Sequence, residues 1–307
     1  RGGGGDFPRN VMASPLAGVS TDEHFNVMPY AEAAGEYMMN FIKAVKFPRK
    51  LKVCFSGSPE NETHATFRDL GFTANSDRTF DVYAAGGLGN KPSLGLCVAS
   101  HIKPEQILYY IKAMVNTFVT YGNYENRGRS RTRFLQETLG KDGLIHAYQE
   151  KLNEVFQTEE LDISVTEPKV VKEADGTPTD FTRLYSQKQS GLYAVFYQPI
   201  GGIISPQKIK ELYDCLKKVE QAEIRLTPEE GLYIINCTAK EAAAIQQITN
   251  DGAQNLFETS IACIGSGICQ VGIGNSQELL KSCVKAVRKE NFADGVLPKI
   301  HISRILL

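Results

Sequence analysis

No part of the sequence has an apolar run near the about 20 residues that a membrane-spanning helix needs. The amino-terminal residues lack a basic region followed by an apolar stretch, so no secretory signal peptide is expected. Neither sign of charge is in excess: 34 Lys and Arg residues stand against 35 Asp and Glu residues, a net charge of −1. Bulk electrostatics therefore favour neither nucleic acid nor an anionic membrane as a partner.

Cysteine is sparse, and its pattern does not suggest disulfide bonds. Seven cysteines, an odd number, are scattered through 307 residues, a length that can form a large core without covalent cross-links. This distribution predicts free thiols in a reducing, cytoplasmic setting. Cys54, Cys97 and Cys237 occur in apolar runs typical of strands, and Cys215 and Cys283 in helical patterns. We expect most of these five to be buried as small apolar side chains.

Strand-like and helix-like segments alternate along the chain, and the alternation starts again after a polar stretch at 158–190. The periodicity predicts helices over 28–46, 104–119, 142–156 and 206–218, and strands over 51–55, 79–85, 192–198 and 231–237. We therefore expect a first half at 1–157, a connection at 158–190 and a second half at 191–307. A short similarity between the two halves supports a duplicated α+β unit. Pro104 and Pro206 each have an Ile two positions before them and another Ile three positions after them. Ser205 is expected to cap the second of these helices.

A glycine-rich segment, Gly86-Gly87-Leu88-Gly89-Asn90, follows a predicted strand. A phosphate-binding loop would need a Lys-Ser or Lys-Thr pair, and a dinucleotide-binding fold a different glycine spacing; both are missing. The next predicted helix also begins too late. The pattern favours a tight turn with positive φ, and it weakens the case for a nucleotide- or flavin-dependent enzyme.

Two basic clusters stand out. In Arg49-Lys50-Leu51-Lys52, the two lysines fall on the same face of the predicted strand, an arrangement suited to a wet surface or to a bound anion. Arginines also occupy alternate positions 127, 129, 131 and 133 before a helix, and guanidinium groups suit carboxylates and phosphates. A solvated charged face remains the alternative for each single residue. No aromatic platform accompanies the arginines, which disfavours nucleic-acid binding.

Cys263 and Cys269 enclose the small residues of Ile-Gly-Ser-Gly-Ile, and such a loop can wrap closely around a metal. Thiolates there suit iron–sulfur clusters or zinc. Two cysteines do not complete a site, and only Cys283 and His301 follow as further candidate ligands. His301 lies in an apolar strand pattern, which favours a structural role for it.

Together, these segments resemble the sulfite and nitrite reductases that carry sirohaem and a 4Fe-4S cluster, over nearly the whole chain. The matching segments are Asp6-Phe7-Pro8-Arg9-Asn10-Val11, Pro48 to Lys52, Gly86 to Gly95, Arg127 to Leu135, Gln189 to Leu192 with Arg225 to Thr227, and Cys263 with Cys269. The resemblance implies an α+β fold of two pseudo-symmetric halves with mixed sheets and flanking helices. The second half would hold a ferredoxin-like repeat and the start of an iron–sulfur domain.

The resemblance also implies roles for particular residues. Arg9, Lys50 and Lys52 would bind the substrate anion and assist its reduction as catalytic groups. Arg49 and Arg127 would pair with sirohaem carboxylates or brace the site, and Asn10 would support it through hydrogen bonds. Cys263 and Cys269 would ligate the cluster. The implied reaction is the six-electron reduction of sulfite to sulfide or of nitrite to ammonia, with electrons from ferredoxin or a flavoprotein; the sequence does not distinguish the two anions.

Two departures from the family pattern concern the ends of the chain. The second cysteine pair of the family would follow the strand at 298–303, where this sequence reads Arg304-Ile305-Leu306-Leu307. A segment that would precede Arg1 is also missing, so the sequence predicts a form truncated at both ends. The alternative is a catalytically inactive domain that acts as a binding or scaffold protein.

Overall fold

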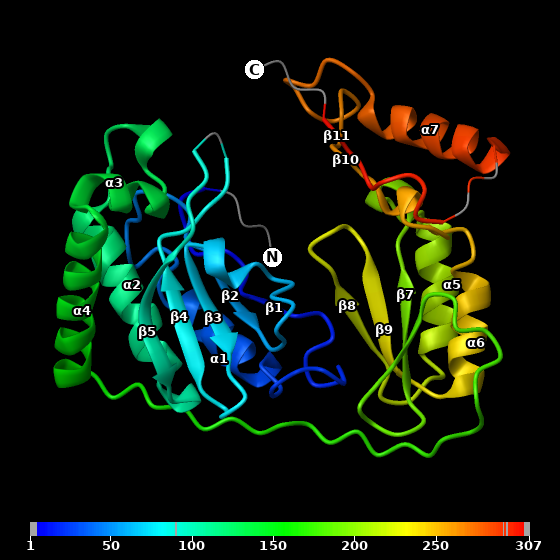
Figure 1. The fold of residues 1–307 in the computed structure, drawn as a ribbon, viewed down its shortest axis with the longest axis horizontal. Coiled ribbons are helices and arrows are strands. Elements are labelled where there is room, and N and C mark those ends of the chain that lie inside the picture. Colours follow the sequence, from blue (N-terminus) through cyan, green and yellow to red (C-terminus); the bar gives the residue numbers. More distant parts are fainter. Residues whose placement is uncertain (1–4, 90, 291, 293, 304–307) are drawn as a thin grey trace. The chain divides into compact units, whose positions relative to one another are not determined.

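The computed structural model describes residues 5–89, 91–290, 292 and 294–303. The chain divides into two compact units, Arg1–Gly18 with Asp22–Pro168 and Val19–Thr21 with Lys169–Leu307 (Figure 1). The division after Pro168 falls inside the segment 158–190 that the sequence predicts as a connection. Within the described ranges, no helix has the length and apolar character that crossing a membrane requires.

The first unit contains a five-stranded mixed sheet whose strands follow one another in chain order. They are β1 (Met12–Ala13), β2 (Val53–Ser56), β3 (Leu70–Ala74), β4 (Phe80–Ala84) and β5 (Leu96–Ile102). β1, β2 and β3 are parallel, and β3, β4 and β5 are antiparallel. All four residues of β2 are buried, as expected for a central strand covered on both faces.

Helices and short 3-10 turns complete the first unit. The helices are α1 (Met28–Met39), α2 (Ile107–Tyr121), α3 (Leu135–Leu139) and α4 (Lys141–Thr158), and the 3-10 turns are η1 (Ala65–Phe67), η2 (Pro104–Gln106), η3 (Arg127–Arg129) and η4 (Thr132–Phe134). Figure 1 shows α2 and α4 side by side. Their buried apolar residues belong to the core of the unit, which also contains Phe55 and Phe72. The rings of these two residues are stacked with their centroids 4.6 Å apart. The helix predicted over 28–46 ends at Met39 and is followed by a turn, and the φ of 70° at Lys43 excludes a continuous helix up to residue 46.

The second unit contains a four-stranded antiparallel sheet in the order β6 (Leu184–Ser186), β7 (Tyr193–Tyr197), β9 (Leu232–Cys237) and β8 (Glu223–Leu226). Helices α5 (Pro206–Leu216) and α6 (Ala239–Ile248) lie together on one face of this sheet (Figure 1). Leu212 and Ile245 from the helices pack against Val195 and Ile234 from the strands. The predicted cap of α5 is confirmed: the Ser205 hydroxyl accepts a hydrogen bond from the backbone N–H of Lys208 at 3.1 Å.

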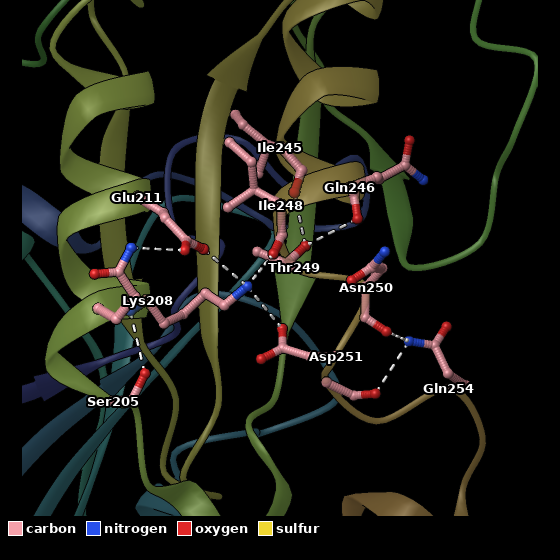
Figure 2. A network of polar contacts seen from close by, with 12 residues as sticks. Ser205, Lys208, Glu211, Ile245, Gln246, Ile248, Thr249, Asn250, Asp251 and Gln254 are labelled. Carbon is pink, nitrogen blue, oxygen red and sulfur yellow. Dashed lines mark hydrogen bonds and ion pairs between the residues drawn. The ribbon is translucent and has the colours of Figure 1, made fainter.

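A polar network joins α5 to the end of α6 (Figure 2). The Lys208 ammonium donates a hydrogen bond to the carbonyl of Ile248 at 2.5 Å and lies 3.2 Å from Glu211 and 3.3 Å from Asp251. The carbonyls at a helix carboxyl terminus lack intrahelical partners and attract cations. Lys208 therefore fixes the spacing of the two helices over the sheet.

The last part of the second unit supports the cysteine loop. β10 (Ile261–Ala262) pairs in parallel with β11 (His301–Ile302), and α7 (Ser276–Glu290) packs on them through Leu280 and Val284. Two 3-10 turns, η5 (Ile200–Gly202) and η6 (Phe257–Thr259), border this small core. The loop between β10 and α7 holds both candidate cluster cysteines.

All seven cysteines are free, and Cys54 and Cys237 are buried, as the sequence predicts. Cys215 and Cys283 are only partly buried and Cys97 is exposed, so the expectation that most of these five cysteines are buried is wrong. Cys97 is exposed because it lies on β5, which is the edge strand of the first sheet and has exposed residues along much of its length.

Candidate functional site

The segment that enters β2 brings its lysines beside the amino-terminal Arg9. Leu51 is buried and forms a parallel bridge with Pro8, and the backbone N–H of Arg9 donates to the carbonyl of Leu51 at 2.8 Å. Lys50 and Lys52 flank Leu51 and are both partly exposed. Alternation along an extended chain therefore places the two ammonium groups on the same side, as the sequence predicts.

Asp6 joins two of the predicted cofactor-binding arginines. Its carboxylate lies 2.7 Å from a guanidinium nitrogen of Arg49 and 2.8 Å from one of Arg127. Burial raises the pKa of Asp6, but the hydrogen bonds and charges of the two arginines outweigh this effect, and the net result is a lowered pKa. Asp6 therefore fixes the positions of two guanidinium groups from segments far apart in the sequence.

The three residues predicted to act on the substrate have no such partner. Among the described residues, Arg9, Lys50 and Lys52 form no ion pair. Arg9 donates from one terminal nitrogen to the carbonyl of Gly5 at 2.7 Å, and its buried Nε has no hydrogen-bond partner within the described part of the chain. The result is a local excess of positive charge with free donors, which is the property an anion site needs.

Burial, together with the charges of neighbouring cations, lowers the pKa values of both lysines. The pKa of Lys50 is lowered by burial and then by the charges of Arg131, Arg9 and Arg49, while Asp69 opposes the shift. The pKa of Lys52 is lowered by burial and then by Arg131, again against the opposing charge of Asp69. A lysine with a lowered pKa gives up its proton more readily, so both ammonium groups are suited to proton donation as well as to anion binding.

Sequence reasoning missed the carboxylate that organises this cluster. The Asp69 side chain is almost fully buried, and it accepts hydrogen bonds from the backbone N–H of Lys52 at 2.9 Å and from the Thr132 hydroxyl. A terminal nitrogen of Arg131 lies 3.4 Å from it. The only signal in the sequence is a charged residue directly before the apolar strand β3.

The glycine-rich segment forms a turn and not a phosphate-binding loop. Gly87 and Ser93 form an antiparallel bridge, Gly89 has a φ of 115°, and the next regular element is the strand β5. This confirms the predicted tight turn. Asn90, the last residue of the predicted segment, lies outside the described residues.

Asn10 is exposed, and its side chain makes no hydrogen bond to any described residue. The predicted support of the basic site by Asn10 is therefore not present among the contacts of this structure. A role of Asn10 in binding a cofactor stays a prediction.

Cys263 and Cys269 lie in the folded loop between β10 and α7. The Cys263 thiol lies 3.0 Å from the hydroxyl of Ser276, the first residue of α7. The backbone N–H of Cys269 donates to the carbonyl of Gly265 at 2.9 Å, and Gly265 itself has a φ of 68°. Both cysteines are partly exposed.

The fit to the expected cofactors differs between the two units. The basic cluster suits a carboxylate-bearing macrocycle, because the buried Nε atoms of Arg9, Arg131 and Arg133 all lack partners among the described residues. The cysteine loop does not complete a cluster site: the described ranges contain no group of three or more His, Cys, Asp or Glu that could hold a metal ion. The expected position of a second cysteine pair, at 304–307, lies outside the described residues.

Structural comparison defines the class of fold. The NirA protein of Mycobacterium tuberculosis superposes with a TM-score of 0.73, and the match covers 97% of this chain and 55% of the NirA chain at 24% sequence identity. At this identity, the likeness shows the fold alone. The expected α+β fold of two halves with sheets and flanking helices is confirmed.

Two family models then match the two units separately. "Nitrite and sulphite reductase 4Fe-4S domain" matches residues 4–156, and "Nitrite/Sulfite reductase ferredoxin-like half domain" matches residues 185–251. The chain belongs to the nitrite and sulfite reductase family.

Curated relatives agree with this assignment. A sulfite reductase (ferredoxin) of Mycolicibacterium paratuberculosis is 25% identical over 93% of this chain and 51% of the relative. A ferredoxin–nitrite reductase of Synechococcus elongatus is 24% identical over 94% of this chain and 57% of the relative. The chain thus spans about half the length of the curated relatives it matches.

Proposed function

We propose that this chain takes part in the six-electron reduction of sulfite to sulfide or of nitrite to ammonia, at a sirohaem coupled to a 4Fe-4S cluster. The electrons would come from ferredoxin or a flavoprotein. One observation carries the proposal: Arg9, Lys50 and Lys52 form a cluster without an ion-pair partner among the described residues. The names of the relatives, which are sulfite and ferredoxin–nitrite reductases, support the two substrates.

The three cations have separate tasks in this proposal. The guanidinium of Arg9 and the ammonium groups of Lys50 and Lys52 bind the oxygen atoms of the anion and stabilise the negative charge that develops there. The lysines also donate protons to oxygen as an S–O or N–O bond breaks, and their lowered pKa assists the transfer. Asp69 opposes the lowering and helps to keep both lysines protonated.

Arg49 and Arg127 would hold the carboxylates of sirohaem while Asp6 fixes their guanidinium groups. Arg127 is exposed and has further donors available, so it is the better suited of the two. Sirohaem would supply an iron centre that binds the anion and delivers electrons singly. Cys263 and Cys269 would provide two of the thiolates of the cluster. Because the free thiols suit a reducing compartment, we place the protein in the cytoplasm.

Anaerobic expression of this chain in cells that produce sirohaem tests the proposal. The visible spectrum and the contents of iron and acid-labile sulfide report the cofactors, and reduction of sulfite and nitrite with an artificial electron donor reports activity. In the loaded protein, Lys50→Ala and Lys52→Ala should each lower turnover about 100-fold with little change in sirohaem content. Lys103→Ala, at an exposed position before η2, is the control. A colourless, iron-free protein, or full activity in both lysine variants, would refute the proposal.

A further inference from the structure

β8 is the edge strand of the second sheet, and its apolar side chains are exposed. The strand order β6-β7-β9-β8 leaves one side of β8 without a neighbouring strand among the described residues. Ile224 is 47% exposed and Leu226 is 77% exposed, whereas their partners across the ladder in β9, Ile234 and Leu232, are buried. An edge strand with exposed apolar side chains is a template for pairing with a strand of another chain.

The backbone groups of Ile224 point to this open side. The backbone N–H of Thr227 donates to the carbonyl of Gly231 at 2.9 Å, in the same register as the ladder between β8 and β9. Hydrogen-bonded pairs alternate with non-bonded pairs in an antiparallel ladder, so Arg225 and Glu223 bond to β9. The N–H and C=O of Ile224 therefore point away from β9 and can bond to a further strand.

The charges of β8 are complementary to those of a second copy of β8. The Arg225 guanidinium donates two hydrogen bonds to the Glu223 carboxylate, at 2.8 and 3.0 Å, so the two side chains share one face of the strand. Two copies that pair in antiparallel orientation about Ile224 place Glu223 of each copy opposite Arg225 of the other. These positions form a non-hydrogen-bonded pair, in which facing side chains are closest. A register centred on Arg225 would instead put two guanidinium groups opposite each other.

Further exposed apolar side chains flank the same edge. Ile203 and Leu226 line one cavity, which places the start of α5 beside the end of β8. Ile209 and Tyr213 are 55% and 65% exposed and lie one turn apart on α5. Lys208 points to the end of α6 (Figure 2), and the helical spacing turns Ile209 and Tyr213 away from it by about 100° or more. An exposed apolar surface of this kind is typical of a protein interface.

We propose that the β8 edge binds a second copy of this chain, by antiparallel pairing of β8 with β8 about Ile224. The product is a homodimer in which the four strands of each second sheet join into one continuous sheet. Ion pairs between Glu223 and Arg225 of opposite copies fix the register. The two-fold axis of such a pair is perpendicular to the sheet, so both copies of α5 lie on the same face, one on each side of the axis. This assembly goes beyond the proposed reaction and needs no cofactor.

Sedimentation velocity of the full chain at several concentrations tests the dimer. The wild type should sediment as a dimer at micromolar concentration. Ile224→Lys places two like charges on the axis and should raise the dimer dissociation constant at least about tenfold. Phe181→Lys changes an exposed apolar residue beside β6, at the other edge of the sheet, and should dimerise like the wild type. A monomeric wild type, or a dimer that Ile224→Lys leaves intact, overturns the inference.

Charge reversal tests the register. Glu223→Arg and Arg225→Glu each put like charges opposite each other, so each variant alone should self-associate more weakly than the wild type. An equimolar mixture brings opposite charges together at both pairs, and the mixed dimer should form at least about tenfold more tightly than either variant alone. Both variants have lost their own pair of residues 223 and 225, so this gain cannot arise within one chain. No gain on mixing overturns the proposed pairing.

Circular dichroism checks the fold of each variant. If a charge-reversed variant does not fold, Ile224→Cys gives the test. The two Cα atoms at position 224 would lie about 5.5 Å apart, a distance that a disulfide can bridge. Mild oxidation should then yield a covalent dimer well above the background of the wild type, which has seven free cysteines of its own. A yield equal to that background overturns the inference.

Discussion

The carboxylate of Asp69 accepts a hydrogen bond from the backbone N–H of Lys52, with 2.9 Å between oxygen and nitrogen. The same carboxylate contacts Thr132 and Arg131, and the carbonyl of Asp69 accepts a hydrogen bond from the N–H of Ala85, next to the glycine turn. One buried residue thus connects the lysine segment, the arginine segment and the turn. The positions of the cations in the first unit depend on it.

Asp69→Asn should destabilise the chain by about 1–3 kcal/mol. Both carboxylate oxygens of Asp69 accept hydrogen bonds, and the amide NH₂ that replaces one of them in asparagine cannot accept. Urea unfolding followed by circular dichroism measures the change. Asp162→Asn, at an exposed position in the connecting segment, should stay within about 0.5 kcal/mol of the wild type. Equal stability of the two variants would show that Asp69 does not organise the cluster.

The lowered pKa values of Lys50 and Lys52 predict opposite effects of pH on anion binding and on stability. Anion binding needs the protonated lysines and is lost as pH rises through their folded pKa values, which lie below the ordinary 10.5. Stability instead increases as pH rises from the folded pKa to the unfolded value, because the unfolded chain then binds more protons. Titration of ¹³C-methylated lysines by NMR measures both pKa values. Lys151, whose pKa is raised chiefly by its hydrogen bond to Glu154, should titrate above 10.5; Lys50 and Lys52 titrating above it would contradict the prediction.

Cys263→Ser should remove iron and acid-labile sulfide from protein purified anaerobically, because the hydroxyl is a poor replacement for a thiolate ligand. The substitution is nearly isosteric, so the contact with Ser276 and the fold of the loop should persist. Cys283→Ser, on α7, is the matched control and should keep its iron. Full iron content in the Cys263 variant would exclude this residue as a ligand.

Lys208→Ala should destabilise the second unit by about 1–2 kcal/mol, since it removes a partly buried ammonium from the carbonyl of Ile248 and from two carboxylates (Figure 2). Lys210→Ala removes a lysine from the same helix whose only ion pair among the described residues is the exposed one with Asp214. Its effect should remain below about 0.5 kcal/mol. Chemical unfolding of the two variants compares them directly, and equal losses would show that the Lys208 network is not a specific link between the helices.

Local sequence patterns predicted many elements of this fold correctly. The apolar periodicity of α2 and the Pro and Ser at the start of α5 act over one or two helical turns, so neighbouring residues are sufficient to specify them. The basic segment around Leu51 was likewise interpretable, because alternation along an extended chain places Lys50 and Lys52 on one side. The helix predicted up to residue 46 was too long, because the chain turns after Met39 and Lys43 has a positive φ that a helix does not allow.

The amino-acid sequence by itself determined the family motifs, the charges of the basic cluster and the type of most helices and strands, because these depend on residue type and short-range spacing. Only the tertiary structure decided which cations have partners. Asp6 pairs with Arg49 and Arg127, which lie 43 and 121 positions away, while Arg133 is buried without a carboxylate. The tertiary structure also made β5 an edge strand and exposed Cys97. Such contacts follow from the order of strands and the packing of distant segments, which no local pattern encodes.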